Sequence, residues 1–448
     1  MSETVLNNHL PKQGSANHFI GGILGLMAAI VSFVPNISIG VLGISAILML
    51  LFLLIGMAVF LYSGARFSPS SYVFRLFVLY SIYCFVMTIA FYFNGATKLS
   101  DKYYLVSNYL NFFWVLAVFL LARLNIQVFW GFTRVFITFL SLLIIFAWFV
   151  LALMFSDIFF LRSDTISLSL LSATDFRNPN VLARTICMLL PCLYLLYRRK
   201  YSMHSGSGFV KAVILMSAMI VFATLSRTNI SVLVIFIVAL MLYKKSLVNK
   251  RILLTSLRYI IGIIIFIIIL YVLIPQVKER ILSIYDMYEA AKKALEYGSL
   301  LPPRIRTWMA SLDIISNYPY FGVGVSDIDS FMAQYGGVHY LENNETKAIA
   351  VHGGFLKVAV YGGLFSLCFF LVFIRKLYSI ANLACRNPEC SIAQRDAGFS
   401  LRLFMVMLVV MNLAADSFGL PVTWIVIGIL LTATIYGDNV SVNKIRNE

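Results

Sequence analysis

Residues 128–155 read VFWGFTRVFITFLSLLIIFAWFVLALMF, an apolar run with one ionisable side chain, Arg134. An α-helix needs about 20 predominantly apolar residues to cross the hydrocarbon core of a bilayer. The apolar residues are continuous, whereas the strands of an outer-membrane barrel alternate between apolar and polar side chains. The run therefore predicts a transmembrane helix.

The whole chain, like this run, is rich in apolar residues and poor in charged ones. Of its 448 residues 61% are hydrophobic and 12% charged, against roughly 45–50% and 25% in ordinary soluble domains. A soluble core of this size cannot bury so much apolar surface, so we expect an all-α polytopic membrane protein with about 12 transmembrane helices. The predicted spans are 18–35, 38–62, 71–93, 103–122, 128–155, 180–197, 208–225, 229–243, 258–275, 352–374, 400–416 and 420–436.

The formal net charge of +16 comes from bases that gather in alternate connections between the spans. Cytoplasmic connections of membrane proteins carry an excess of Lys and Arg, so this pattern sets the orientation and places both ends of the chain in the cytoplasm. It accounts for the positive charge without a nucleic acid partner. The bases on this side include Arg123, Arg198, Arg199, Lys200, Lys244, Lys245, Arg375, Lys376, Arg386 and Arg395.

The spans predict three segments. Residues 1–275 hold the first nine helices, 276–351 form a large outer loop, and 352–448 hold the last three helices and a cytoplasmic tail. A connection of about 75 residues is far longer than an ordinary one, which favours a functional role. Within it we expect helices over 278–296 and 303–317, the second starting after Pro302 and followed by a glycine turn.

Three arginines and a histidine are predicted at the outer face. Arg227 lies between two apolar runs and either snorkels to the interface or binds a ligand. Arg304 and Arg306 lie in the first turn of a predicted helix, where the partial positive charge of the helix end disfavours cations unless an anion is near. His352 precedes Gly353-Gly354, so its ring can face the loop and a ligand could approach the backbone, although a structural histidine is the simpler interpretation.

Two acidic patterns have alternative interpretations. Asp416, at the outer end of a predicted span, is an unpaired candidate that could partner a site arginine or orient His352, or could simply end a helix. Asp327-Ile328-Asp329 is a D-x-D sequence, and two such carboxylates can share a divalent cation. Because this pattern is short and common, we expect a solvated loop there, with no metal and no cofactor.

The order of several motifs resembles the superfamily of O-antigen polymerases and O-antigen ligases. The motifs are Asn178-Pro179-Asn180, Ser226-Arg227, Arg304-Ile-Arg-Thr-Trp308, Pro319-Tyr-Phe-Gly322-Val-Gly324, and His352 with Gly363. Together they cover about residues 175–365. The chain departs from the superfamily at Gly353, where an asparagine commonly follows the histidine.

The resemblance implies a fold similar to the multi-span glycosyltransferases (GT-C type) and glycosyl transfer in the bacterial inner membrane, with the active site facing the periplasm. The donor would be an undecaprenyl-diphosphate-linked glycan. Arg227, Arg304 and Arg306 would bind the diphosphate without a metal, because guanidinium groups bind phosphate oxygens bidentately. His352 would act as catalytic base on the acceptor hydroxyl, with inversion at the anomeric carbon. Asp416 and Asn180 would support the site.

Three functions remain open from the sequence. A repeat-unit polymerase, with a lipid-linked repeat unit as acceptor, is favoured because 15 residues separate Arg306 from Gly322, a spacing that resembles polymerase loops. A ligase would use lipid A–core as acceptor. Membrane lipids and a chain-length regulator are further candidate partners of the protein. A transporter or flippase of lipid-linked oligosaccharide is disfavoured, because it would place charges around a cavity at the membrane midplane.

Overall fold

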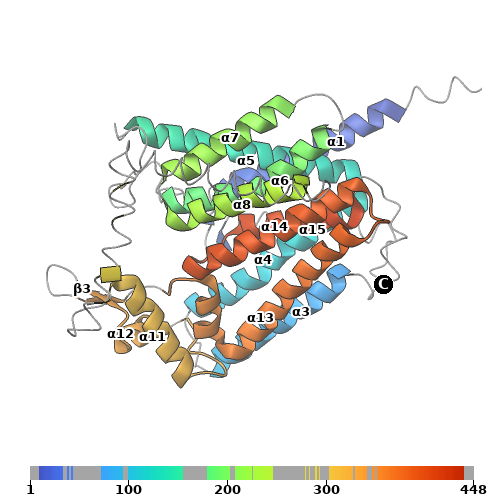
Figure 1. Ribbon diagram of the computed structural model, residues 1–448. Helices are drawn as coiled ribbons and strands as arrows, with labels where there is room; N and C mark the ends of the chain where they lie inside the picture. The colour runs from blue at the N-terminus through green and yellow to red at the C-terminus, as the bar shows by residue number, and fades with distance from the viewer. Residues whose placement is uncertain are drawn as a thin grey trace, which may run out of the picture.

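The computed structural model describes residues 10–33, 38–39, 42–43, 72–93, 99–154, 179–201, 207–224, 226–245, 302–325, 328–340, 346–348 and 351–437, with single positions between 278 and 292. These residues are mainly helical (Figure 1). The helices are α1 Leu10–Phe33, α3 Tyr72–Phe93, α4 Leu99–Leu124, α5 Ile126–Met154, α6 Pro179–Tyr201, α7 Ser207–Ala223, α8 Arg227–Lys245, α11 Pro303–Asn317, α12 Ile328–Gln334, α13 Gly354–Arg386, α14 Ile392–Ala414 and α15 Pro421–Tyr436.

Ten of the predicted spans fall on these helices. Five helical segments are long and apolar enough to cross a membrane, and five shorter helices are apolar as well. The long segments are Tyr72–Phe93, Ile126–Val150, Asn180–Arg199, Gly354–Arg386 and Ile392–Ala414. The predicted span 258–275 lies outside the described residues, as does most of the predicted loop helix 278–296. The described helices support a multi-pass membrane protein.

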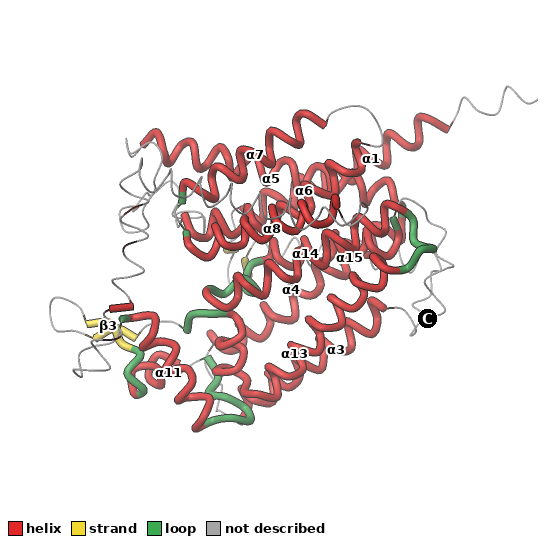
Figure 2. The backbone as a smooth tube through the Cα atoms, in the orientation of Figure 1, coloured by secondary structure: helices red, strands yellow, loops and turns green. Residues whose placement is uncertain are grey.

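The described residues are all-α in fold class, as predicted, apart from two short hairpins that the sequence did not predict. Ser38–Ile39 (β1) pairs with Leu42–Gly43 (β2), so the span predicted from residue 38 begins with a tight antiparallel hairpin. In the segment predicted to form the outer loop, Val338–Tyr340 (β3) pairs with Thr346–Ala348 (β4), and Figure 2 draws these strands at one edge of the molecule. Gly336, with φ of 79°, and Gly337 follow α12. Glycine readily takes such a left-handed conformation and ends a helix there, and the next residues, Val-His-Tyr, include strongly strand-forming types.

Small residues bring α1 and α5 into close contact. A Cβ atom at Gly21 would meet the carbonyl oxygen of Val128, and one at Gly25 would meet that of Phe132. From the other side, a Cβ atom at Gly131 would meet the carbonyl oxygen of His18. Membrane helices that lack a hydrophobic driving force associate through such close backbone approach.

A cluster of aromatic rings joins α3, α4, α13 and α15. The ring centroid of Tyr80 lies 4.9 Å from that of Phe112, 5.2 Å from Phe373 and 5.0 Å from Trp424. All four side chains are buried. Offset and edge-on aromatic pairs add about 0.5–1.5 kcal/mol each beyond their buried area, so this cluster fixes how the C-terminal helices pack on the earlier ones.

An ion pair and a hydrogen bond to the same carboxylate join α6, α8 and α14 at one end of the bundle. Arg198 Nε, near the end of α6, lies 3.1 Å from Asp396 Oδ2, near the start of α14. The hydroxyl of Tyr243, near the end of α8, donates to Asp396 Oδ1 at 3.0 Å. At 1.5 Å per residue, the other end of α6 lies about 27 Å away, and the next section describes the polar residues at that end.

Candidate active site

A cavity of about 430 Å³ opens at the end of the bundle opposite the Arg198–Asp396 pair. Its lining comes from four helices, α6, α8, α11 and α14, and from residues that flank α8, α13 and α14. The lining residues are Asn180, Arg184, Ser226, Arg227, Thr228, Asn229, Arg304, His352, Ala414 and Ala415. The described residues that line it thus carry three guanidinium groups and no carboxylate.

The cavity lies at the N-termini of four helices. Asn180 lies at the start of α6, Arg227 begins α8, Arg304 is in the first turn of α11, and His352 stands two residues before α13. The N-terminus of a helix carries a partial positive charge and unpaired backbone N–H groups, and both attract anions. Together with the three arginines, these helix ends make the cavity suited to a multiply charged anion.

The starts of α6 and α8 are tied together beside the cavity. Asn229 Nδ2 donates to the backbone oxygen of Asn180 at 3.0 Å and to Ser226 Oγ at 2.9 Å. The backbone oxygen of Ser226 accepts the first bond of α8, from Ile230 N at 2.9 Å. Asn229 is almost fully buried, so its amide holds Arg227 at a fixed place relative to α6.

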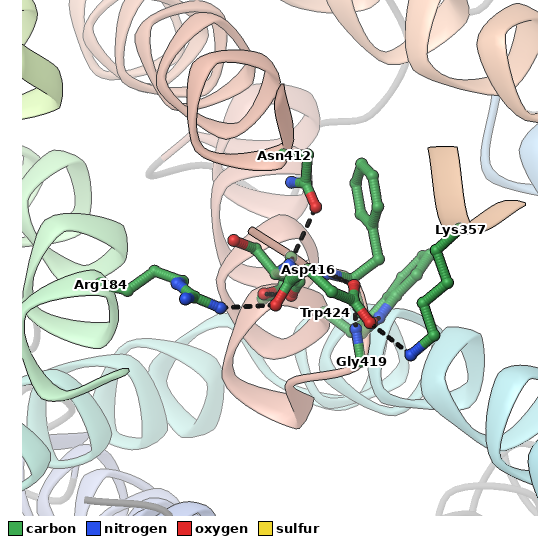
Figure 3. A network of polar contacts seen from close by, with 9 residues as sticks. Arg184, Lys357, Asn412, Asp416, Gly419 and Trp424 are labelled. Atoms are coloured by element: carbon green, nitrogen blue, oxygen red, sulfur yellow. Dashed lines mark hydrogen bonds and ion pairs between the residues drawn. The ribbon is translucent and has the colours of Figure 1, made fainter. Parts of the chain in front are cut away.

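A second polar network joins α6, α13 and the turn after α14 (Figure 3). Arg184 Nη1 donates to the backbone oxygen of Asp416 at 2.6 Å. The carboxylate of Asp416 accepts from Lys357 Nζ at 2.8 Å and from the backbone N–H groups of Phe418 and Gly419 at 3.0 and 3.3 Å. The turn therefore fixes the position of Arg184 at the cavity.

His352 is positioned by the two glycines that follow it. Gly353 has φ of 100°, a conformation that side chains disfavour. A Cβ atom on Gly353 would come within 3.1 Å of the backbone oxygen of Leu413, and one on Gly354 would clash with Asn412 Oδ1 and the ring of Phe418. The sequence suggested that a ligand could approach these glycines. The structure corrects this, because the end of α14 fills that space.

The surroundings of His352 favour its neutral form. Burial lowers the pKa of the imidazole below its ordinary value of 6.5, and the positive charges of Arg304 and Arg184 lower it further. A neutral ring has one nitrogen lone pair that can accept a proton. His352 can therefore act as a base at neutral pH.

The glycine motif of the outer loop binds to a break in α13. Gly363 has φ of 73° and ψ of −178° within α13, so the helical hydrogen bonds are interrupted there. Val323 N and Gly324 N donate to the backbone oxygens of Val360 and Tyr361 at 2.9 and 3.0 Å. Leu364 N donates to Pro319 O at 2.7 Å.

These bonds fix the segment that directly follows α11 against the helix that directly follows His352. A Cβ atom at Gly363 would clash with the backbone oxygen of Tyr320, and one at Gly322 with that of Val360. The glycines of the motif thus hold the outer loop on the bundle. They do not line the cavity.

Four of the residues named from the sequence meet at the cavity: Asn180, Arg227, Arg304 and His352. Arg306 does not line it. Asp416 lies beside it, and the interpretation of Asp416 as unpaired is wrong, because Lys357 crosses from α13 to its carboxylate. Asp327 of the D-x-D sequence lies outside the described residues, and among the described ones no group of three His, Cys, Asp or Glu side chains could hold a metal ion.

Sequence reasoning missed two residues of this region. Arg184 lies four residues after Asn180, and this spacing puts both on one face of α6, so the pattern Asn-x-x-x-Arg was a usable signal. Lys357 had no such signal, because 59 residues separate it from Asp416. Only the packing of α13 against α14 brings the two together.

Comparison with known protein families matches residues 212–371 to the family described as O-antigen ligase. This segment is similar to that family over 160 residues. The resemblance to the superfamily of O-antigen ligases and polymerases is therefore confirmed over a little over a third of the chain. A comparison with curated proteins gives no match.

The matched segment contains Arg227, Arg304 and His352 but not Asn180, Arg184 or Asp416. The cavity thus combines residues of that segment with residues on both sides of it. The match supports a function of the O-antigen ligase or polymerase type and favours neither of the two.

Proposed function

We propose that this chain transfers a glycan from undecaprenyl diphosphate to the hydroxyl of a lipid-linked acceptor. The observation that carries the proposal is the cavity in which Arg184, Arg227 and Arg304 surround the same space as His352. Three guanidinium groups and four helix N-termini suit a diphosphate, and a neutral imidazole beside them suits an acceptor hydroxyl.

In the proposed reaction, the acceptor oxygen attacks the anomeric carbon on the side opposite the diphosphate. The bond from that carbon to the acceptor oxygen forms while the bond to the diphosphate oxygen breaks, which inverts the configuration. His352 takes the proton of the hydroxyl. The arginines stabilise the negative charge that develops on the departing diphosphate, and such electrostatic stabilisation is usually the largest catalytic contribution.

This electrostatic role requires no metal ion, because guanidinium groups supply the positive charge. We expect activity of the purified protein to persist in EDTA, and we expect the double substitution Asp327→Ala with Asp329→Ala to retain most of it. Loss of activity in EDTA with recovery in magnesium or manganese would assign the diphosphate to the D-x-D sequence instead.

As acceptor we propose a lipid-linked repeat unit, which makes the protein a repeat-unit polymerase. The 15-residue spacing between Arg306 and Gly322 supports this choice. The alternative is a ligase that uses lipid A–core, and the name of the matched family supports it. A chain-length regulator is a partner expected for the polymerase.

The glycan profile of cells that carry His352→Ala separates the two enzymes. A strain without polymerase activity leaves lipid A–core capped with a single repeat unit. A strain without ligase activity leaves uncapped core and long glycan on the polyprenyl carrier, which would replace the polymerase assignment with the ligase. Normal long chains would contradict both and favour a protein without this chemistry, such as a flippase.

We further propose twelve spans in the bacterial inner membrane, grouped as 1–275, 276–351 and 352–448, with the cavity facing the periplasm. The bases near the Arg198–Asp396 end support a cytoplasmic location for that end. A cysteine introduced at Ser299 tests the orientation. It should react with a membrane-impermeant reagent once the outer membrane is opened, and protection would refute the model of topology.

A further inference from the structure

Helix α11 has three sides of different chemistry. Thr307, Ala310, Ser311 and Ile314 form the buried side, which packs on the protein. Arg306, Asp313 and Asn317 form a polar side. Between them lies a third side, which carries Ile305, Trp308, Met309, Leu312 and Ile315.

The centre of the third side is apolar and exposed, while Ile305 and Ile315 at its margins are half-buried. The exposed fractions of Trp308, Met309 and Leu312 are 41%, 47% and 57%. The buried side holds smaller and more polar residues, two of them hydroxyl side chains that donate to the backbone of α11 itself. In a soluble protein the larger apolar side would be expected to face the core. The pattern of α11 therefore indicates that this side contacts an apolar environment other than the core of the protein.

The neighbours of α11 indicate what that environment is. In Figure 1 α11 runs crosswise to α13, and it packs against that helix near the cavity end of the bundle. Tyr320, three residues beyond α11, stacks on Phe365 of α13 with ring centroids 5.7 Å apart. Leu364 and Phe365 are exposed on α13, a segment apolar enough to span a membrane. The exposed apolar surface of the loop is thus continuous with the outer surface of that helix.

We propose that α11 is an interfacial helix whose apolar side, Trp308, Met309 and Leu312, lies in the outer lipid leaflet. Amphipathic helices with Trp on the apolar side and Arg next to it bind in this way, parallel to the membrane surface. Trp and Tyr rings concentrate at the same depth, as Trp308 and Tyr320 would here. The proposal does not depend on the proposed chemistry.

Docking of α11 in the leaflet would set the position of the cavity along the membrane normal. Arg304 is one turn before Trp308 on α11 and lines the cavity. A helix held at the level of the headgroups therefore places this guanidinium at the depth where the phosphates of lipids lie.

Fluorescence of a probe attached to α11 tests the proposal without measuring activity. The six natural cysteines are replaced, and single cysteines at Leu312 or at Asn317 are labelled with an environment-sensitive dye in the full-length protein in phosphatidylcholine vesicles. We expect the probe at Leu312 to be quenched by spin-labelled acyl chains and shielded from aqueous iodide. The matched probe at Asn317, on the polar side, should show the opposite pattern.

Equal quenching of both probes by iodide would overturn the proposal, because the apolar side would then face water. An apolar environment at Leu312 that acyl-chain quenchers do not reach would also overturn it and would indicate a protein partner or a second copy. If the cysteine-free protein does not accumulate, brominated lipids replace the dye. They should quench the natural protein more than Trp308→Phe, and equal quenching would contradict the proposal.

Discussion

Lys357 Nζ lies 2.8 Å from Asp416 Oδ2, and this ion pair joins the first turn of α13 to the turn that follows α14. The same turn accepts a hydrogen bond from Arg184 through its backbone. Residues of α6 and α13 thus meet at Asp416, Arg184 at its backbone oxygen and Lys357 at its carboxylate. The pair itself does not line the cavity, so its expected role is to hold Arg184 and His352 at their places.

Asp416→Ala should lower the free energy of unfolding by about 1–3 kcal/mol, because it leaves Lys357 and two backbone N–H groups without their acceptor. Asp416→Asn should have a smaller effect, since its oxygen can still accept from Phe418 N and Gly419 N. Thermal unfolding in detergent measures both. Asp313→Ala, at an exposed carboxylate, is the control, and a loss for Asp416→Ala no larger than the control would contradict the role of the turn.

Gly363→Ala should destabilise the protein by more than about 1 kcal/mol, because alanine disfavours a φ of 73° and its Cβ would clash with Tyr320 O. The bonds that hold the outer loop on α13 should weaken with it. Limited proteolysis of the 276–351 loop in membranes provides the measurement. Cleavage should be faster than in the natural protein. Gly336→Ala is the control, because Gly336 also has a left-handed φ but nothing lies near a Cβ atom there. Its cleavage rate therefore shows the effect of the backbone conformation without a steric clash.

The pH dependence of transfer should follow the neutral form of His352. Its pKa lies below 6.5, so the base form predominates at pH 7 and kcat/KM should fall only as the pH drops below 6.5. In Arg304→Gln one of the charges that lower this pKa is absent, so the acidic limb should move to higher pH. Arg306→Gln is the control and should leave the limb unchanged. An identical limb in all three proteins would show that another group titrates.

Arg304→Lys should reduce the rate of transfer by roughly 30- to 1,000-fold, equivalent to about 2–4 kcal/mol, because a point charge cannot replace a bidentate guanidinium. Arg306→Lys, two residues along the same helix but away from the cavity, should retain most of the rate. A radiolabelled-donor assay on purified proteins of matched accumulation measures both. If Arg306→Lys were the more damaging change, the diphosphate would have to bind elsewhere.

Much of the helical architecture follows from local sequence. Apolar runs long enough to cross a bilayer predict ten of the described helices, and Pro302-Pro303 predicts where α11 begins. The two hairpins could not be predicted in this way. Residues 38–39 and 42–43 open an apolar run, and composition alone does not distinguish a short strand pair from the first turn of a span.

The candidate site could be predicted only in part. Arg227 and His352 are recognisable because each lies at the edge of an apolar run, and Arg304 because it lies in the first turn of a predicted helix. The role of Lys357 is not recognisable, because it depends on how α13 packs against α14. Arg304 and Arg306 are equivalent in the sequence, and only the rotation of α11 on the bundle brings Arg304 to the cavity and turns Arg306 away.

The lining of the cavity runs in the sequence from Asn180 to Ala415, and this spread has a consequence for biosynthesis. Chains are generally made and folded from the N-terminus onward, so the walls from α6 and α8 exist before the ribosome has reached the outer loop. The arginine of α11 and the histidine before α13 join them later, and α14 closes the cavity last. A nascent chain therefore carries no complete site until most of it has been translated, and ribosome-bound chains that stop before Ala415 should lack the proposed transfer activity.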